Sequence, residues 1–250
     1  MKQLNGSVHR IWYDEPSLWA EEQNSRVKKE CRFLDTLFKK HKVHKVLDVG
    51  CGVGSHCGYL KNLGYSPIGI DLNKKLIEYA KKHFPNIPFS VADQTKYKLK
   101  EKFDAVYTIC TVISYVITNE DLFKTLKNHN ASLKKNGLLV ISTFNPIVFI
   151  DQKEYGHIRK VKANSLGYWS MRRYSTDLNK QLSIDEATFY DSKTGRVVSS
   201  DRSVKRMTFP QEMRFFLEQA GFRVLSFNSE FDFNHKVLDG NYMTIVAQKI

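Results

Sequence analysis

The sequence has little of three features that would assign it to a special class of protein. It contains only 4 cysteines in 250 residues and no Cys-x-x-Cys pair, which excludes a small disulfide scaffold and argues against a zinc site. Its most apolar stretch, 137–150, is interrupted by polar residues and is shorter than the roughly 18 residues of a membrane-spanning helix. No apolar segment of signal-peptide length stands near Met1. We therefore expect a cytoplasmic protein without a bound metal.

Acidic residues are scarce relative to basic ones. The chain has 39 Lys and Arg against 26 Asp and Glu, which gives a formal net charge of +13. Such an excess favours an anionic partner, but the basic residues are spread along the chain and never form a run of five. The charge therefore permits nucleic acid as a partner without favouring it.

The first part of the chain alternates strand-like and helix-like patterns, which predicts a parallel sheet with helical crossovers. The length suits one large domain or one domain with an insertion. Strands are expected over 43–49, 67–71, 87–91, 103–109 and 138–144. Helices are expected over 55–63, 74–83 and 119–133, the last capped by Asn119 and followed by Gly137.

The alternation ends after Pro146. Residues 157–207 are strand-like, and Asp191 to Gly195 has the composition of a hairpin turn. A helix is then expected from Pro210 to Ala220, before two strands over 222–228 and 242–248 that run antiparallel to each other. We predict a seven-stranded doubly wound core from 1–150 and 208–250, with an antiparallel β insertion over 151–207 after the fifth strand.

A glycine-rich turn follows the first predicted strand, at Gly50, Gly52 and Gly54. Glycines there let a ligand lie directly on the backbone and on the N-terminus of the next helix. The Gly-x-Gly-x-Gly spacing lacks the third glycine of the dinucleotide fingerprint, and no Gly-Lys-Ser/Thr sequence follows, which excludes a P-loop. The ligand therefore need not be a diphosphate.

Acidic or amide side chains end the next two predicted strands. Asp71 lies about 20 residues after the first glycine, where a carboxylate accepts hydrogen bonds from ribose hydroxyls. Asp93 and Gln94 end the third strand, where they can pair with the edge of a purine. Because the carboxyl ends of parallel strands share one edge of a sheet, these features are expected to form a single nucleoside site.

These residues resemble the motifs of the class I S-adenosylmethionine-dependent methyltransferases, strongly over 43–144 and more loosely at the C-terminus. The matching segments are 47–54 (LDVGCGVG), 69–72 (GIDL), 92–94 (ADQ), 103–106 (FDAV) and 133–140 (LKKNGLLV). The resemblance implies a Rossmann-like α/β fold and S-adenosylmethionine as the cofactor, with S-adenosylhomocysteine as its product.

The resemblance also implies which residues contact the cofactor. They are Tyr13, Asp48, Gly50, Cys51, Gly52, Gly54, Asp71, Leu72, Asp93, Gln94 and Cys110. The segment 11–14 (IWYD) is similar to the aromatic segment that closes over the ligand in relatives, so residues 1–40 are expected to form a helical lid. Relatives have a second tyrosine soon after, for which Trp19 stands here; simple packing of an N-terminal helix is the alternative interpretation.

Candidates for contact with the methyl acceptor are Tyr115, just after the fourth strand, and His157, at the start of the insertion. Tyr155 and Glu154 are further candidates for a general base, which is needed only if the acceptor must lose a proton. Each of these side chains is also compatible with a purely structural role. The Asn/Asp-Pro-Pro-Tyr/Phe signature of amide and nucleobase methylation does not occur at 108–111 (TICT).

The inserted β segment resembles the small-molecule branch of the family, which includes amino-sugar N-methyltransferases. We therefore predict methyl transfer to a nitrogen or oxygen of a small molecule that enters beneath the insertion as a cap. Arg159, Arg172 and Arg173 would suit an anionic acceptor. An RNA methyltransferase and a non-catalytic S-adenosylmethionine-binding protein stay open as alternatives, as does the choice between monomer and homodimer.

Overall fold

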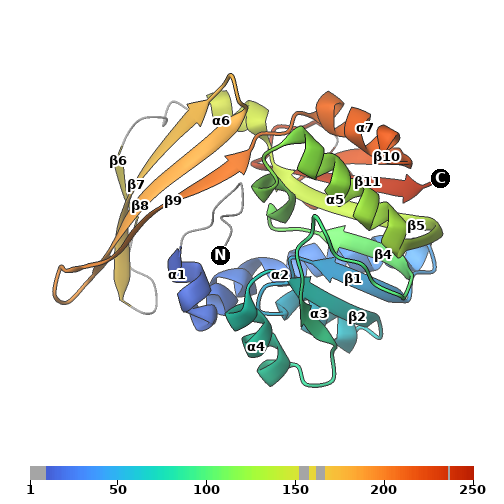
Figure 1. The fold of residues 1–250 in the computed structure, drawn as a ribbon, viewed down its shortest axis with the longest axis horizontal. Coiled ribbons are helices and arrows are strands. Elements are labelled where there is room, and N and C mark those ends of the chain that lie inside the picture. The colour runs from blue at the N-terminus through green and yellow to red at the C-terminus, as the bar shows by residue number, and fades with distance from the viewer. Residues whose placement is uncertain (1–9, 152–157, 162–166, 236) are drawn as a thin grey trace.

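The computed structural model describes residues 10–151, 158–161, 167–235 and 237–250 (Figure 1). The first half contains α1 (Arg10–Asp14), α2 (Pro16–Lys40), β1 (Lys45–Val49), α3 (Ser55–Asn62), β2 (Ser66–Asp71), α4 (Lys74–His83), β3 (Phe89–Val91), β4 (Phe103–Thr108) and the short 3-10 helix η1 (Val112–Tyr115). The second half contains α5 (Asn119–Ser132), β5 (Leu133–Phe144), α6 (Pro146–Asp151), β6 (Ile158–Val161), β7 (Tyr168–Asp177), β8 (Leu182–Asp191), β9 (Val197–Arg206), α7 (Pro210–Gln219), β10 (Phe222–Ser229) and β11 (Tyr242–Lys249).

Seven strands form one sheet in the order β10-β11-β5-β4-β1-β2-β3. The pairs between β1 and β2, β1 and β4, β2 and β3, and β4 and β5 are parallel, whereas β11 is antiparallel to both β5 and β10. Strands β2 and β3 lie on one side of β1, and β4 and β5 lie on the other. The connections that follow β1 and β4 therefore run in opposite directions, which opens a crevice at the carboxyl ends of these two strands. The predicted fold class, including the antiparallel β insertion after the fifth strand, is confirmed.

Helices cover both faces of this sheet (Figure 1). On one face, Leu122 and Leu126 of α5 and Leu217 of α7 pack with strand residues in a large buried cluster. On the other face, α2 contributes Leu34 and Phe38, together with neighbours at the same helical spacing. Each layer removes a broad apolar surface from water, which is the main stabilising contribution to such a fold.

Helix α5, Asn119–Ser132, agrees with the prediction of 119–133 to within one residue, but the residues predicted to cap and to end it are wrong. The residue that caps α5 is Thr118 and not Asn119, because the extended backbone of Thr118 lets its hydroxyl accept a hydrogen bond from the Asp121 N–H at 3.1 Å. The Asn119 side chain instead accepts from Arg206 at 2.6 Å. Gly137 does not end the helix, since α5 stops at Ser132 and β5 has already begun at Leu133.

Strands β6, β7, β8 and β9 form a separate antiparallel sheet beside the seven-stranded one (Figure 1). The N-terminal helices contact this second sheet, because Ile11 and Leu18 pack against Ala187 and Phe189 of β8 in a small buried cluster. Helix α1 and the first part of α2 therefore lie between the inserted sheet and the core. Among the described residues, no helix is both long and apolar enough to cross a membrane.

Candidate active site

The glycine turn after β1 has the backbone conformation that only glycine adopts readily. Gly50, Gly52 and Gly54 have φ angles of +81°, +54° and +82°. A Cβ atom on Gly52 would lie 2.8 Å from Nε1 of Trp19, and one on Gly50 would lie 2.4 Å from Cγ1 of Val112. The turn is therefore closed over by α2 on one side and by η1 on the other, and no side chain fits between them.

Asp71 joins this turn to the end of β2. Its Oδ2 accepts a hydrogen bond from the Gly52 N–H at 2.9 Å, and its Oδ1 accepts from the Asn73 N–H at 2.8 Å. Burial raises the pKa of the Asp71 carboxyl, and these backbone donors oppose the shift. Each carboxylate oxygen retains lone pairs for hydroxyl donors. The next side chain, Leu72, is 41% exposed and is free to pack on a flat ring.

The loop after β3 supplies an acceptor that lacks a partner among the described residues. Gln94 donates from Nε2 to the Val112 carbonyl at 3.2 Å, while its buried Oε1 accepts no hydrogen bond from this part of the chain. Asp93 is engaged locally, since its Oδ1 accepts from the Thr95 N–H and hydroxyl at 2.8 Å each. A buried unpaired amide oxygen costs free energy unless a ligand donates to it. The exocyclic amine of an adenine would satisfy Gln94.

Two of the predicted cofactor residues lie beneath the turn. The Cys51 side chain is buried in the cluster formed with Cys57 and Ile77, and its N–H donates to the Ile70 carbonyl at 3.0 Å. Asp48 is 2% exposed, accepts from the Cys57 thiol at 3.4 Å, and has its pKa raised by burial to about 6. Both residues are thus placed to support the turn from below.

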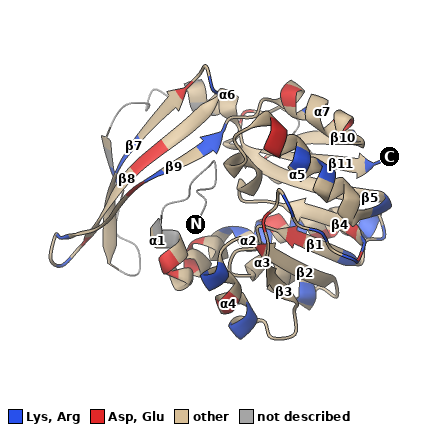
Figure 2. Ribbon diagram, viewed as in Figure 1, with Lys and Arg blue, Asp and Glu red and all other residues tan. Residues whose placement is uncertain are grey.

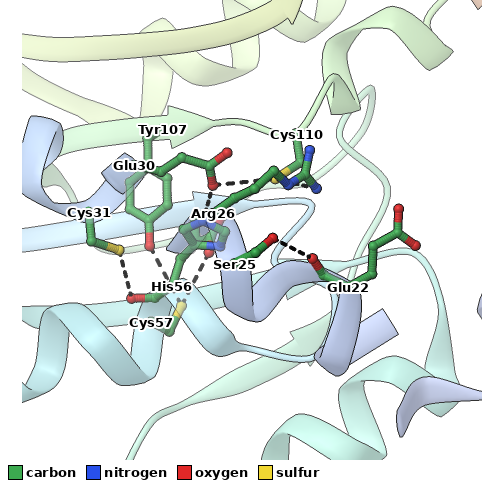
Figure 3. Close-up of polar contacts among 10 residues, drawn as sticks. Glu22, Ser25, Arg26, Glu30, Cys31, His56, Cys57, Tyr107 and Cys110 are labelled. Atoms are coloured by element: carbon green, nitrogen blue, oxygen red, sulfur yellow. Dashed lines mark hydrogen bonds and ion pairs between the residues drawn. The ribbon is translucent and has the colours of Figure 1, made fainter. Parts of the chain in front are cut away.

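A buried polar network links α2 to the loop after β4 (Figure 3). His56 Nε2 lies 2.6 Å from Oε2 of Glu30, and the Cys110 thiol lies 3.8 Å from the same oxygen. The Arg26 guanidinium donates to Cys110 Sγ at 3.9 Å. Cys110 and Thr111 both have positive φ, 56° and 62°, which is strained for such residues and aims the thiol at α2.

Sequence reasoning missed Arg26, Glu30 and His56. A signal for Glu30 exists in retrospect, because it lies on the apolar stripe of α2 beside Val27 and Leu34, where an acid requires a buried partner. Although burial alone would raise the pKa of Glu30, its hydrogen bond to His56 and the charges of His56 and Arg26 hold that pKa below its usual value. The pairing itself depends on the tertiary packing of α2 on α3.

The same cluster bears on metal binding. The ligand atoms of Glu30, His56 and Cys110 lie within 4.8 Å of one another. Glu30 already pairs with His56, and the cationic Arg26 beside Cys110 opposes the binding of a second cation. That the protein binds no metal stays a prediction.

Two tyrosines approach the crevice from different elements. Burial raises the pKa of Tyr13 on α1, and the nearby Asp71 and Tyr115 add to the shift. Burial also raises the pKa of Tyr115, whose hydroxyl forms a hydrogen bond with Ser203 of β9. The structure thus brings Tyr13 and Tyr115 together near Asp71. His157, Tyr155 and Glu154 lie outside the described residues.

The residues of the crevice fit an S-adenosyl ligand. Asp71 has spare acceptor capacity, and within the described ranges Gln94 Oε1 lacks a donor. Gln23 of α2, near Gly52, likewise has a buried Oε1 with no donor among the described residues. These unsatisfied atoms flank the turn, as expected where a polar ligand completes the hydrogen bonding.

Part of the chain matches a known family and several curated proteins. Residues 46–137 match a family described as a methyltransferase domain. The ubiquinone biosynthesis O-methyltransferase of Pelagibacter ubique is 37% identical over 105 residues, which are 40% of this chain and 42% of that protein. A dTDP-4-amino-2,3,4,6-tetradeoxy-D-glucose N,N-dimethyltransferase of Saccharopolyspora spinosa is 30% identical over 107 residues, 42% of this chain and 43% of that protein. In these two relatives and in a second ubiquinone biosynthesis O-methyltransferase, the match with this chain spans about half of the relative's length.

Solved structures resemble nearly the whole chain. An S-adenosylmethionine-dependent methyltransferase from Clostridium acetobutylicum superposes with a TM-score of 0.81 at 14% identity and covers 96% of each chain. A sugar N-methyltransferase from Streptoalloteichus has a TM-score of 0.73 at 21% identity, covering 96% of this chain and 93% of the other. At these identities the likeness establishes the fold. The domain match confirms the predicted resemblance to methyltransferases over residues 46–137. One of the similar solved structures, an amino pentose methyltransferase at 18% identity, contains bound S-adenosylmethionine.

Proposed function

We propose, from the premise that residues 46–137 belong to the methyltransferase domain family, that this protein transfers a methyl group from S-adenosylmethionine to a small molecule. The hydrogen bond from the Gly52 N–H to Asp71 carries the proposal, because it joins the glycine turn and the ribose-binding acid into one site. Among the similar proteins are an O-methyltransferase and an amino-sugar N,N-dimethyltransferase, so we propose a nitrogen or oxygen as the acceptor atom.

The cofactor would lie along the carboxyl edge of β1, β2 and β3. Asp71 accepts from the ribose hydroxyls, Leu72 packs on the adenine, and Gln94 accepts from its amine. Arg26 and Cys110 lie at the far end of the turn, where the methionine portion would extend, and the guanidinium suits its carboxylate. Bound there, S-adenosylmethionine supplies an electrophilic methyl group on a sulfonium.

The protein's own contribution to the reaction is to position the acceptor and to exclude water. We propose that residues 151–207 act as a cap over the acceptor and that α1 and α2 close the other side. Tyr115 keeps its proton because its pKa is raised, so it serves as a hydrogen-bond donor that orients the acceptor rather than as a base. A neutral amine attacks without prior loss of a proton, so an amine acceptor requires no strong base.

The first test is cofactor binding. S-adenosylhomocysteine at about 100 times its dissociation constant should stabilise the folded protein by about 2.7 kcal/mol, or about 5–10 °C in Tm for a chain of this size. Asp71→Ala should remove most of that rise, because the ribose hydroxyls and the Gly52 N–H both lose their acceptor. Asp177→Ala, at the hairpin between β7 and β8, where the carboxylate accepts from the Lys180 N–H, is the matched control and should respond as the unaltered protein does.

A full response in Asp71→Ala would contradict the assigned ribose site, and stabilisation by NAD instead of S-adenosylhomocysteine would contradict the cofactor. Transfer itself is tested with methyl-labelled S-adenosylmethionine against a panel of small amines and phenols. If the protein binds S-adenosylhomocysteine but labels none of the panel or cellular metabolites, the non-catalytic binding protein becomes the better account.

A further inference from the structure

The inner face of the inserted sheet brings charged side chains to the proposed acceptor side of the crevice. Successive residues of a strand point to opposite faces, so Asp185 of β8 and its cross-strand partner Ser203 of β9 share one face with Lys205, two residues along. Tyr174 of β7, opposite Asp185, shares it too. This face meets η1, because Lys205 Nζ lies 5.2 Å from the centre of the Tyr115 ring.

Lys205 is the unmatched cation of that face. Arg172, on the same face, has a partner, since its Nη1 lies 3.4 Å from Oδ2 of Asp185. Among the residues that the structure describes, the Lys205 ammonium forms no ion pair within 4.0 Å and no hydrogen bond, and it lies over the ring of Tyr115; Asp185 acts on it only from a longer distance. Burial lowers the pKa of Lys205. Lys205 is half-buried, so its ammonium can reach a ligand, and a ligand anion would offset the cost of its partial burial.

Helix α2 places two more charges opposite this face. Glu22 and Arg26 are near enough to influence one another electrostatically, and the charges of Arg172 and Lys205 also act on Glu22. Within the described ranges, none of these cations lies within 4.0 Å of the Glu22 carboxylate. Arg172 is engaged by Asp185, and the proposed function pairs Arg26 with the carboxylate of the cofactor. Lys205 is therefore the cation of this face that is available to an acceptor molecule between α2 and β9.

We propose that Lys205 binds an anionic group of the methyl acceptor, a carboxylate or a phosphate, and so selects acidic acceptors over neutral ones. This inference rests on the proposed function, because it places the acceptor between Tyr115 and β9. The ring of Tyr115 holds the ammonium in position before the ligand arrives. A neutral acceptor would leave the charge unpaired, which is the physical basis of the selection.

Thermal unfolding of the protein saturated with S-adenosylhomocysteine tests this assignment. Pyrophosphate is the phosphate probe and malonate the carboxylate probe, each compared with sodium chloride at equal ionic strength. We expect at least one probe to raise Tm by several degrees beyond chloride, and the stronger probe identifies the anion class. Lys205→Met should weaken the apparent binding of that probe by about tenfold or more, while Lys205→Arg should keep it.

Lys193→Met, in the exposed hairpin turn between β8 and β9, removes the same charge elsewhere and should behave as the unaltered protein. The response to S-adenosylhomocysteine shows that each variant is folded, and Lys205→Gln replaces the Met variant if that one does not fold. An unaltered protein that responds to neither probe beyond chloride, or a Lys205→Met or Lys205→Gln variant that responds fully, overturns the role of Lys205. Failure of S-adenosylhomocysteine to stabilise the unaltered protein would instead contradict the proposed function.

Discussion

Asp71 uses both oxygens of its carboxylate on backbone N–H groups, one of them from the glycine turn. An acid that only exposed a polar group to solvent at the end of β2 would form no hydrogen bond with Gly52. Asp93 shows the contrast, since Oδ1 turns back to Thr95 in its own loop. Aspartates at the ends of neighbouring strands therefore have different hydrogen-bond partners, which depend on the backbone N–H groups that lie within reach of each carboxylate.

Arg26 permits a test that separates the two ends of the cofactor. The guanidinium forms no ion pair with the described carboxylates and lies beside Cys110. Arg26→Met should weaken the binding of S-adenosylhomocysteine by about 10- to 100-fold, as expected for loss of a charge-assisted hydrogen bond. Binding of 5′-methylthioadenosine, which lacks the amino-acid carboxylate, should not change. Calorimetric titration measures both ligands, and Lys29→Met on the same helix is the control.

An equal loss for the two ligands would mean that Arg26 supports the fold of the site and does not bind the carboxylate. An unchanged affinity for both would remove Arg26 from the cofactor site altogether.

Asp48 predicts an unusual dependence of stability on pH. Its pKa in the folded protein is raised by burial to about 6, above the value in the unfolded chain. Between about pH 4 and pH 6 the folded state therefore binds more protons, so this residue's contribution to stability is lost as the pH rises, by up to about 3 kcal/mol. Urea unfolding of the unaltered protein and of Asp48→Asn over this range should show the variant gaining relative stability as pH rises. A constant difference between the two proteins would contradict the raised pKa.

At the scale of elements, α1 and the start of α2 connect the two sheets. Ile11 and Leu18 pack on β8, while Trp19 lies over Gly52. The N-terminal segment therefore touches both the inserted sheet and the proposed cofactor bed. This arrangement suits a lid over the cofactor. It is equally expected if the aromatic residues only pack the N-terminal helices, so a measurement of motion in the segment distinguishes the two interpretations.

We predict that S-adenosylhomocysteine slows amide hydrogen exchange in residues 10–23. A ligand on the glycine turn would contact Trp19 and Gln23 and thereby stabilise the first turns of α2. Strand β11, at the other side of the core, is the internal control and should change little. Equal protection of β11 and residues 10–23 would indicate general stabilisation of the fold, and the lid role would be wrong.

At the scale of the whole molecule, the net charge of +13 is distributed over many elements. Figure 2 shows Lys and Arg on the helices of the core, on the sheet and at the hairpins of the insertion, interspersed with acidic residues. One basic groove, lined by Lys28, Lys29, Arg32 and the aromatic Phe33 and Phe233, does not include the glycine turn or the strand-end acids. The charge therefore gives no direct support to an RNA substrate.

We expect any binding of tRNA to be weak and to fall steeply with salt between 50 and 200 mM, as non-specific phosphate contacts do. No methyl label from S-adenosylmethionine should enter RNA under conditions in which small acceptors are labelled. Filter binding and label incorporation into total RNA measure the two quantities. RNA labelling that Lys28→Met with Lys29→Met abolishes would favour the RNA methyltransferase and place its substrate in the basic groove.

The sequence by itself determined the parallel core, the glycine turn and the positions of Asp71 and Gln94, because these depend on short-range patterns of apolar residues and on backbone conformations that only glycine adopts readily. It also located the inserted antiparallel strands and their hairpin at Asp191. Only the tertiary structure decided that Glu30 pairs with His56, that Arg26 reaches Cys110, and that Lys205 lies over the ring of Tyr115. The paired residues are 26 positions apart for Glu30 and His56, 84 for Arg26 and Cys110, and 90 for Tyr115 and Lys205. Such contacts arise from the packing of helices on sheets, so no local sequence pattern predicts them.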